Sequence, residues 1–369
     1  MIVFIAYTLN NACILACVQL VDLAMQPDLP KPPVTLRDIA RRLDVSHTTI
    51  SRALRNDLEI SKKTRERVQV VAQEMGYRPN PMLNALAHYR RGKTKLPIAA
   101  ELAWFNHWPN PEKLRSFKEF NLYWQGAFEE ADRCGFRLEE FTLKNASLER
   151  LEKILRARNI RGILLPPLGN FAPDYRQVNW DDFCIVRFGH SINYPHAHMV
   201  TSDQLTDGVI AYENILKNGY NRIGLATSFK MQTRFSAGYL FSQAKWNPSI
   251  RLSPLVLSQE RGDGDKKLLK KWLMTNKPDA IVTDVGELRG LLSEIGWKVP
   301  EDVGLAALSV LDGNADAGIN QNSYEIGRAA VQLLISLINH NESGIPNICR
   351  ELLVEGSWVD GSTLPPKRR

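Results

Sequence analysis

Three short stretches near the start of the chain carry apolar residues at the spacing of an α-helix. The first opens with Thr35 and Asp38, a capping-box pattern, and its apolar face consists of Leu36, Ile39, Ala40 and Leu43. The second begins after Ser46, an expected N-cap, and its apolar face consists of Ile50, Ala53 and Leu54. The third is expected over residues 61–75, with Ser61 as its cap. Three such helices can close a small all-α core.

The turn between the first two helices is very short and spans only residues 43–46. Two helices joined so tightly are typical of a helix-turn-helix, whose second helix lies in the major groove of DNA. The outward face of that second helix is polar and cationic, with His47, Thr48, Ser51, Arg52 and Arg55. On these residues alone, an ordinary helical hairpin with a solvated polar face is the alternative.

After residue 96 the pattern changes, and strand-like apolar runs alternate with helical ones. Strands are predicted at residues 98–105, 137–142, 162–165, 184–188, 222–226, 280–283 and 303–308. Helices are predicted at residues 123–135, 148–158, 207–217, 266–275 and 288–295. This alternation indicates parallel sheets with helices on both faces. Its two halves indicate two Rossmann-like lobes with a cleft between them.

Basic residues are concentrated in the segment that contains the three helices. Residues 31–95 hold fifteen Lys and Arg against six Asp and Glu, whereas the whole chain of 369 residues has a net charge of only +7. Cations clustered on a small domain indicate a phosphate-backbone partner such as double-stranded DNA. A solubilising surface would instead spread its charge along the chain.

Residues 1–33 contain an apolar leader and a proline-rich lead-in, and we expect this part not to be folded. The leader lacks the positive residues of a secretory signal, and export would separate a DNA reader from its DNA. We therefore expect the mature chain to begin near Met25. Five cysteines at irregular spacings indicate reduced thiols in the cytoplasm.

Several motifs along the chain match one known family. In the head they are Val34-Thr35-Leu36-x-Asp38-Ile39-Ala40, Val45-Ser46-x-x-Thr49-Ile50-Ser51-Arg52-x-Leu54, Ser61-x-x-Thr64-Arg65-x-Arg67-Val68 and Gly76-Tyr77-Arg78-Pro79-Asn80. Weaker matches are Lys217-x-Gly219-Tyr220-x-Arg222-Ile223-Gly224, Pro278-Asp279-Ala280-Ile281, Gly296-Trp297-x-Val299-Pro300-Glu301-Asp302-Val303 and Ile326-Gly327-x-x-Ala330-x-x-Leu333-Leu334. In these residues the chain resembles the LacI/GalR-type transcriptional repressors. The resemblance implies a small all-α helix-turn-helix head, joined by a hinge helix to a two-lobed α/β domain like that of periplasmic binding proteins.

The resemblance divides the chain after residue 33 into three parts. The DNA-binding head is expected at residues 34–76, and a hinge helix with a basic linker at residues 77–95. A two-lobed domain for effector binding and dimerisation is expected at residues 96–369. Its N-lobe would cover about residues 96–218 and 320–341, and its C-lobe about residues 222–318 and 345–360.

The function implied by the resemblance is that of a sequence-specific DNA-binding regulator, a repressor that binds a palindromic operator as a homodimer in the cytoplasm. A small polar metabolite, a sugar or sugar derivative, would bind between the lobes and set the affinity for DNA. The sequence has no Walker motif and no Gly-x-Ser-x-Gly motif, so we expect no enzyme. We also expect no cofactor, metal or membrane partner. The alternative is a solute-binding sensor of the same fold without DNA control.

Residues expected to contact DNA lie in the head and in the hinge segment. They are Thr35, Ser46, His47, Thr48, Thr49, Ser51, Arg52, Arg55, Asn56, Tyr77, Asn80, Met82, Leu83 and Leu86. Arg52 can grip phosphate or guanine as a fork, and His47 and Thr48 are expected to set the base preference. By the resemblance, Leu86 would enter the minor groove when two hinge helices pair on DNA.

Residues expected to bind the effector lie mostly at strand ends facing the cleft. They are Trp104, Asn106, Asp203, Arg234, Asp284 and Gln321. Asp203 matches the family's effector-binding aspartate but is also a good helix N-cap. Trp104 is either a stacking platform for a ring or a core aromatic. The family's carboxylate after the strand that ends near Leu308 is missing here, because Ser309 and Val310 follow instead.

Overall fold

The computed structural model describes residues 34–54, 57, 59–77, 100–143, 147–169, 173–228, 233–258, 262–311, 313 and 315–367. The chain divides into two compact units, residues 1–80 and residues 81–369, and each is described by itself. The leader, the predicted hinge helix and the linker, at residues 1–33 and 78–95, lie outside the described residues. What the sequence predicts for them therefore stays a prediction.

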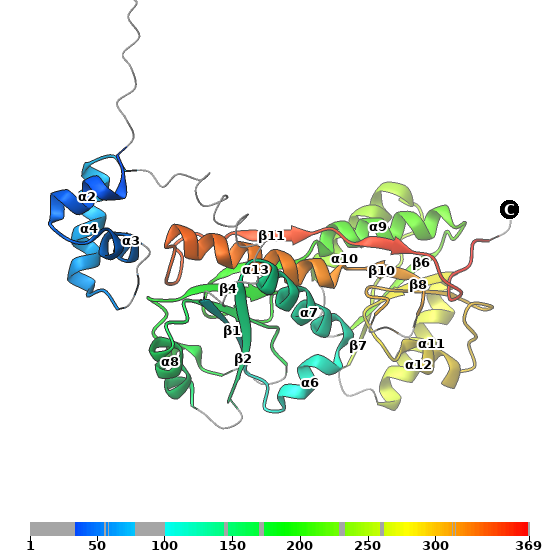
Figure 1. Ribbon diagram of the computed structural model, residues 1–369. Coiled ribbons are helices and arrows are strands. Elements are labelled where there is room, and N and C mark those ends of the chain that lie inside the picture. The colour runs from blue at the N-terminus through cyan, green and yellow to red at the C-terminus, as the bar shows by residue number, and fades with distance from the viewer. Residues whose placement is uncertain are drawn as a thin grey trace, which may run out of the picture. The chain divides into compact units, whose positions relative to one another are not determined.

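The first unit is a bundle of three helices, α2 (Leu36–Leu43), α3 (His47–Leu54) and α4 (Lys62–Glu74) (Figure 1). Its core consists of buried residues from all three helices, namely Ile39, Leu43, Ile50, Ala53, Val68 and Ala72. The Asp38 carboxylate accepts hydrogen bonds from the backbone N–H and the hydroxyl of Thr35, and the Ser61 hydroxyl accepts one from the Thr64 N–H. Asp44 ends α2 at φ 50°, which turns the chain sharply into α3. The predicted helix-turn-helix is confirmed.

The N-lobe is built on six parallel strands in the order β11-β5-β4-β3-β1-β2. The strands are β1 (Ala100–Asn106), β2 (Phe136–Thr142), β3 (Gly162–Leu165), β4 (Cys184–Phe188), β5 (His198–Ser202) and β11 (Glu351–Val354). The helices of this lobe are α6 (Pro111–Ser116), α7 (Lys118–Arg133), α8 (Leu148–Ala157), α13 (Ser323–His340) and the short 3-10 helix η2 (Tyr175–Gln177).

The C-lobe repeats this plan with the strand order β12-β10-β9-β8-β6-β7, in which only β12 is antiparallel to its neighbour. The strands are β6 (Ile223–Ser228), β7 (Leu255–Leu257), β8 (Ala280–Thr283), β9 (Gly304–Ala307), β10 (Gly318–Asn320) and β12 (Ser357–Val359). The helices are α9 (Gln204–Lys217), α10 (Thr233–Trp246), α11 (Asp263–Asn276) and α12 (Leu288–Glu294).

Both sheets bury apolar side chains on both faces. On β1, Trp104 packs with residues of α7 and α13, whereas the next residue, Phe105, packs with residues of α8. This follows because successive side chains of a strand point to opposite faces. In the C-lobe, α9 and α10 cover one face, and α11 and α12 cover the other. The two doubly wound lobes predicted from the alternating pattern are thus confirmed.

The chain crosses between the lobes three times, and hydrogen bonds hold the crossing segments together. β5 leads into α9, β10 leads into α13, and β11 leads into β12. The N–H of Asp203 donates to the last carbonyl of β11 over 2.8 Å, and the N–H of Gly356 donates to Asp207 Oδ1 over 3.0 Å. The side chain of Asn322 donates to the carbonyl of Glu355 over 2.8 Å. The C-terminal crossing is therefore bonded to both of the others.

Two lobe boundaries differ from those that the sequence pattern predicts. The prediction places α9 in the N-lobe, but its buried residues Ala211, Tyr212 and Ile215 belong to the core of the C-lobe. It also places β11 in the C-lobe, but β11 pairs with β5 in the N-lobe sheet. Periodicity predicts what kind of element a segment forms, whereas the sheet that it joins depends on where the chain crosses.

Glycines bring two pairs of helices into very close contact. In the N-lobe, α7 and α13 lie side by side (Figure 1), with Gly126 and Gly327 at their contact. A methyl group at Gly327 would lie 2.2 Å from the carbonyl oxygen of Tyr123. In the C-lobe, α9 and α10 make the corresponding contact through Gly208 and Gly238. Because a larger side chain would collide with backbone, these glycines set the separation of each helix pair.

Candidate functional site

The N-terminal end of α3 presents two exposed polar side chains, His47 and Thr48. Ser46 before them is the N-cap: its hydroxyl accepts a hydrogen bond from the Thr49 N–H over 3.0 Å and pairs with the Thr49 hydroxyl over 2.8 Å. The cap fixes the first turn and engages the side chains of Ser46 and Thr49. His47 and Thr48 therefore lie exposed at the end of α3 with which a recognition helix contacts base edges, and their contact with DNA stays a prediction.

Arg52 lies in the last turn of α3 and is held within the head. Its Nε donates to Asp57 Oδ2 over 2.7 Å, and its Nη2 pairs with Glu59. The hydrogen bonds that the guanidinium donates to Asp57 and Glu59 raise its pKa above the usual value. Arg52 thus ties the end of α3 to the loop before α4. The predicted fork to DNA would have to compete with these two carboxylates.

The other predicted DNA contacts fall into two groups. In the described head, Thr35 is exposed, Ser51 is half-buried, and Tyr77 packs against the core, where burial raises the pKa of its phenol. The second group lies outside the described residues, and its contacts stay predictions: Arg55, Asn56, Asn80, Met82, Leu83 and Leu86.

A cavity of about 1270 Å³ opens between the two lobes. Strand ends and helix starts of both lobes line it, as expected for open α/β sheets. Three of the six predicted effector residues line this cavity: Arg234, Asp284 and Gln321. Ser309, which stands where the family has a carboxylate, lines it as well. The volume exceeds the roughly 300–1,000 Å³ of most small-molecule pockets, so the open cleft has room for a ligand larger than a single sugar ring.

Two predicted effector residues lie in the N-lobe core instead. Trp104 has no exposed surface, and its ring packs edge-on against Trp124 with centroids 5.4 Å apart. Asn106 is also fully buried: it accepts a hydrogen bond from the Trp108 N–H over 3.0 Å and donates one to Glu140 over 2.8 Å. Trp104 is therefore a core aromatic, the alternative reading of its position. Asn106 holds the loop that carries Trp108.

Asp203 is not among the residues that line the cavity. Its carboxylate accepts hydrogen bonds from the N–H and the hydroxyl of Thr206, over 3.2 and 2.7 Å. Both oxygens are engaged in capping α9, which is the alternative that its sequence position left open. Its neighbours Ser202 and Gln204 do line the cavity, so Asp203 acts on the cleft by fixing the start of α9.

Four aromatic side chains that the sequence pattern did not single out line the N-lobe side of the cavity. This aromatic wall consists of Trp108, Phe117, Phe120 and Tyr123, whose consecutive ring centroids lie 5.9, 5.4 and 5.8 Å apart. Trp108 is fixed by a hydrogen bond from its Nε1 to the Pro167 carbonyl over 2.8 Å. The pattern that could have revealed the wall is three aromatics spaced three residues apart at the start of α7, the second helix after β1.

The C-lobe side of the cavity carries polar side chains, among them Ser228, Arg234, Asp284 and Arg289, beside apolar ones such as Val285 and Leu308. The Asp284 carboxylate accepts hydrogen bonds from the N–H and the hydroxyl of Ser228, over 2.9 and 3.2 Å, and burial raises its pKa. Asp284 therefore joins the end of β8 to the end of β6 and supports the cavity wall. Arg234 near the start of α10 and Arg289 near the start of α12 are exposed and line the cavity.

The described ranges contain neither a cluster of metal ligands nor a helix that could span a membrane. Within them, no three His, Cys, Asp or Glu side chains gather in a way that could hold a metal ion. The thiols of Cys134, Cys184 and Cys349 form no disulfide. None of the described helices combines the length and the apolar character needed to cross a membrane.

Known proteins with similar sequence are transcriptional regulators. Residues 35–80 match the family described as bacterial regulatory proteins, lacI family. The HTH-type transcriptional repressor CytR of Escherichia coli K12 is 28% identical over 348 residues, which cover 88% of this chain and 96% of CytR. The HTH-type transcriptional regulator MalR of Streptococcus pneumoniae TIGR4 is 23% identical over 338 residues, which cover 89% of this chain and 99% of MalR.

Solved structures with a similar fold come from the same class. The transcriptional regulator CelR, in its complex with cellobiose, gives a TM-score of 0.51 at 20% identity and covers 89% of this chain and 99% of its own. The transcription regulator CcpA of Lactococcus lactis gives a TM-score of 0.51 at 15% identity and covers 71% of this chain and 99% of its own. Because these sequence identities are low, the two structures show only that the fold is similar.

A helix-turn-helix head joined in one chain to a two-lobed α/β domain with a cleft defines a class of DNA-binding transcriptional regulators. The match of the head and the full-length relatives identify the group within this class. Residues 35–80 match the LacI family of bacterial regulatory proteins, as the motifs of the head predict, and the chain is similar to full-length transcriptional regulators over most of its length.

Proposed function

We propose that this regulator is a repressor that binds a palindromic operator as a homodimer in the cytoplasm, and that a small polar metabolite sets its affinity for DNA. The observation that carries the proposal is the presence, in one chain, of a capped α3 with an exposed N-terminal end and of a roomy cleft between two lobes. A sugar or sugar derivative is supported by the polar side chains on the C-lobe side of the cavity, and by CelR, which was solved with cellobiose.

The residues are proposed to act as follows. His47 and Thr48 read base edges, and the hinge leucine Leu86 enters the minor groove. Arg234 and Gln321 contact the metabolite in the cleft. The remaining head residues named above contact or position the phosphate backbone. Lobe movement about the three crossings would change the spacing of the paired heads and so release or retain the operator.

The competing proposal, a solute-binding sensor without DNA control, fits the head poorly. The basic excess lies in residues 31–95, and the caps of α2, α3 and α4 are all formed. A head that had lost its function would have no reason to keep both features. Both relatives described above are named as regulators of transcription.

The test is selection of duplexes from a random pool by the full-length chain, read by gel shift and sequencing. We expect one palindromic sequence to be enriched. The double variant His47→Ala/Thr48→Ala should enrich a different or degenerate sequence, whereas Glu74→Ala, at an exposed position at the end of α4, should leave the preference unchanged. If the unaltered chain enriches nothing above random duplexes, the DNA-binding function is refuted. A carbohydrate panel added to the selected operator then tests metabolite control.

A further inference from the structure

The cleft is lined by more cationic than anionic side chains, and the two kinds differ in the partners that they have within the protein. The charged side chains are Lys113, Glu119, Arg234, Asp284 and Arg289. Over the described parts of the chain, no carboxylate forms an ion pair with Lys113, Arg234 or Arg289. Both Asp284 oxygens accept hydrogen bonds from Ser228, and Glu119 interacts within the protein. The cleft lining therefore carries three cationic side chains against two carboxylates, and no described carboxylate forms an ion pair with any of the three cations.

Basic groups gather most closely around Arg234. Burial has the largest effect on the pKa of His190 and of Arg187 and lowers both; the positive charge of Arg234 acts in the same direction, whereas the carboxylate of Glu351 opposes it at both groups. Arg187 is buried and donates to the Gly189 carbonyl over 2.7 Å, so its charge has a fixed position. His190 lines the cavity, and its Nε2 is buried without a hydrogen-bond partner among the described groups. A ligand group that accepts hydrogen bonds and carries negative charge would complement this end of the cleft.

The opposite side of the cleft has a different chemistry. The aromatic wall offers a continuous run of ring faces and edges, and Phe117 within it keeps 38% of its surface exposed. Apolar surface of this kind favours the flat face of a ring, aromatic or sugar, over an extended polar chain. Carboxylates are strong acceptors for the hydroxyl protons of a neutral sugar. Here the family's carboxylate is replaced by Ser309, and Asp284 is already engaged.

We propose that the effector is a ring-bearing organic anion, whose phosphate or carboxylate group is bound by Arg234 and Arg289 while its ring packs against the aromatic wall. This inference rests on the proposed function, because it concerns the same cleft. The planar guanidinium presents paired N–H donors that match the oxygens of phosphate and carboxylate. Lys113 adds a third positive charge on the N-lobe side of the cleft. When the lobes close on a bound anion, the negative charge of the anion would offset the charge of Lys113.

The test measures binding to the full-length chain by calorimetry and by the thermal midpoint. The probes are inorganic pyrophosphate, with sodium chloride of equal ionic strength as its control, and two matched pairs, glucose with glucose 6-phosphate and adenosine with adenosine monophosphate. The variants are Arg234→Gln, Arg289→Gln and the two combined. The matched control is Arg251→Gln, since Arg251 is an exposed arginine of the C-lobe that does not line the cavity.

We expect pyrophosphate to raise the thermal midpoint, and the charged member of at least one pair to bind about tenfold more tightly than its neutral partner. The double variant should remove both effects, and Arg251→Gln should remove neither. Equal or tighter binding of the neutral members overturns the inference, as does the failure of every anionic probe to bind. Operator affinity measured on the same samples distinguishes this inference from the proposed function. If a neutral ligand binds and changes the operator affinity, the anion inference is wrong but the proposed function is supported.

Discussion

The guanidinium of Arg52 is bound by Asp57 and Glu59, so its removal acts on the head itself. We expect Arg52→Ala to weaken operator binding by about tenfold or more and to speed hydrogen exchange of the amides at residues 59–65, because the loop before α4 loses its tie to α3. Hydrogen exchange by mass spectrometry, with His47→Ala as control, measures this. The control should alter operator preference with no change in exchange. Unaltered exchange in Arg52→Ala would mean that the arginine serves DNA contact alone.

Asp207 is a fully buried carboxyl at a lobe crossing, and burial raises its pKa to about 7 from the usual 3.8. Nearby Asp203, Glu355 and Glu119 act in the same direction, whereas the hydrogen bond from Gly356 opposes them. Since the folded form binds the proton more tightly than the unfolded form, this group costs no stability below pH 4. Its cost grows as the pH rises from about 4 to 7, towards a limit of roughly 4 kcal/mol.

We therefore expect Asp207→Asn, which keeps an oxygen for the Gly356 N–H, to be more stable than the unaltered chain at pH 8 and nearly equal to it at pH 4.5. Thermal midpoints across this range give the comparison. The exposed aspartate Asp132 on α7 supplies the control variant Asp132→Asn, which should follow the unaltered chain throughout. An advantage for Asp207→Asn that is the same at both pH values would show that titration of Asp207 is not its cause.

At the scale of elements, the contact between α7 and α13 depends on glycine. A methyl group at Gly327 would lie 2.2 Å from a backbone oxygen of α7, so Gly327→Ala must push the helices apart. We expect a loss of about 1–3 kcal/mol in the free energy of unfolding. Gly290 is also helical but has no neighbour within 4 Å of an added methyl group. Gly290→Ala should therefore be neutral or stabilise by up to about 1 kcal/mol. Urea unfolding of both variants decides whether crowding or helix propensity dominates.

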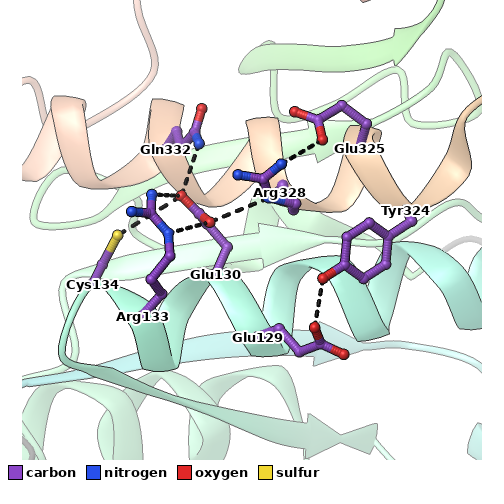
Figure 2. A network of polar contacts seen from close by, with 8 residues as sticks. All are labelled: Glu129, Glu130, Arg133, Cys134, Tyr324, Glu325, Arg328 and Gln332. Atoms are coloured by element: carbon purple, nitrogen blue, oxygen red, sulfur yellow. Dashed lines mark hydrogen bonds and ion pairs between the residues drawn. The ribbon is translucent and has the colours of Figure 1, made fainter. Parts of the chain in front are cut away.

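The same two helices are joined by a buried charge. Figure 2 shows the Glu130 carboxylate of α7 between Arg133 of its own helix and Arg328 and Gln332 of α13. Its side chain is only 1% exposed. The hydrogen bond from Arg133, aided by those from Gln332 and Arg328, lowers the pKa of Glu130 to about 2 in spite of burial. The carboxylate thus contributes stability that is complete above about pH 4.5 and is lost as the pH falls through about 2.

We expect Glu130→Gln to lower the free energy of unfolding by roughly 1–3 kcal/mol at pH 7, with a smaller difference at pH 3. Glu129→Gln is the matched control, because Glu129 accepts only a hydrogen bond from Tyr324 at the exposed edge of the same contact (Figure 2). Urea unfolding at the two pH values tests both variants. A loss for Glu130→Gln that is as large at pH 3 as at pH 7 would contradict the role of its charge.

At the scale of the whole molecule, sequence periodicity predicts many of the buried strands but misses others and even long helices, among them β5, α10 and α13. The buried runs at residues 162–165, 184–188 and 280–283 are β3, β4 and β8. The strands β7, β10 and β12 have only three residues each, which is too few for an alternating pattern to stand out. Their place is set by the sheets that they complete.

Only some of the residues that line the cleft can be predicted from the local sequence. Placement directly after a strand is enough to find Asp284, whereas Arg234 was expected from the family resemblance. Asp203 could not be assigned from sequence, since a capping aspartate and a ligand-binding aspartate occupy the same position after a strand. Phe117 and Phe120 were missed because their helical spacing is also that of a core stripe.

The course of the chain's end has a consequence for shortened forms of the protein. The strands β11 and β12 lie within residues 351–359, yet each forms the edge of a different lobe's sheet. A stop codon after residue 350 would therefore strip one strand from both lobes at once, uncovering the fully buried β5 on one side and β10 on the other. It would also take away Gly356, the hydrogen-bond donor to Asp207. A late nonsense mutation, which spares nearly all of the reading frame, should leave only the head able to fold.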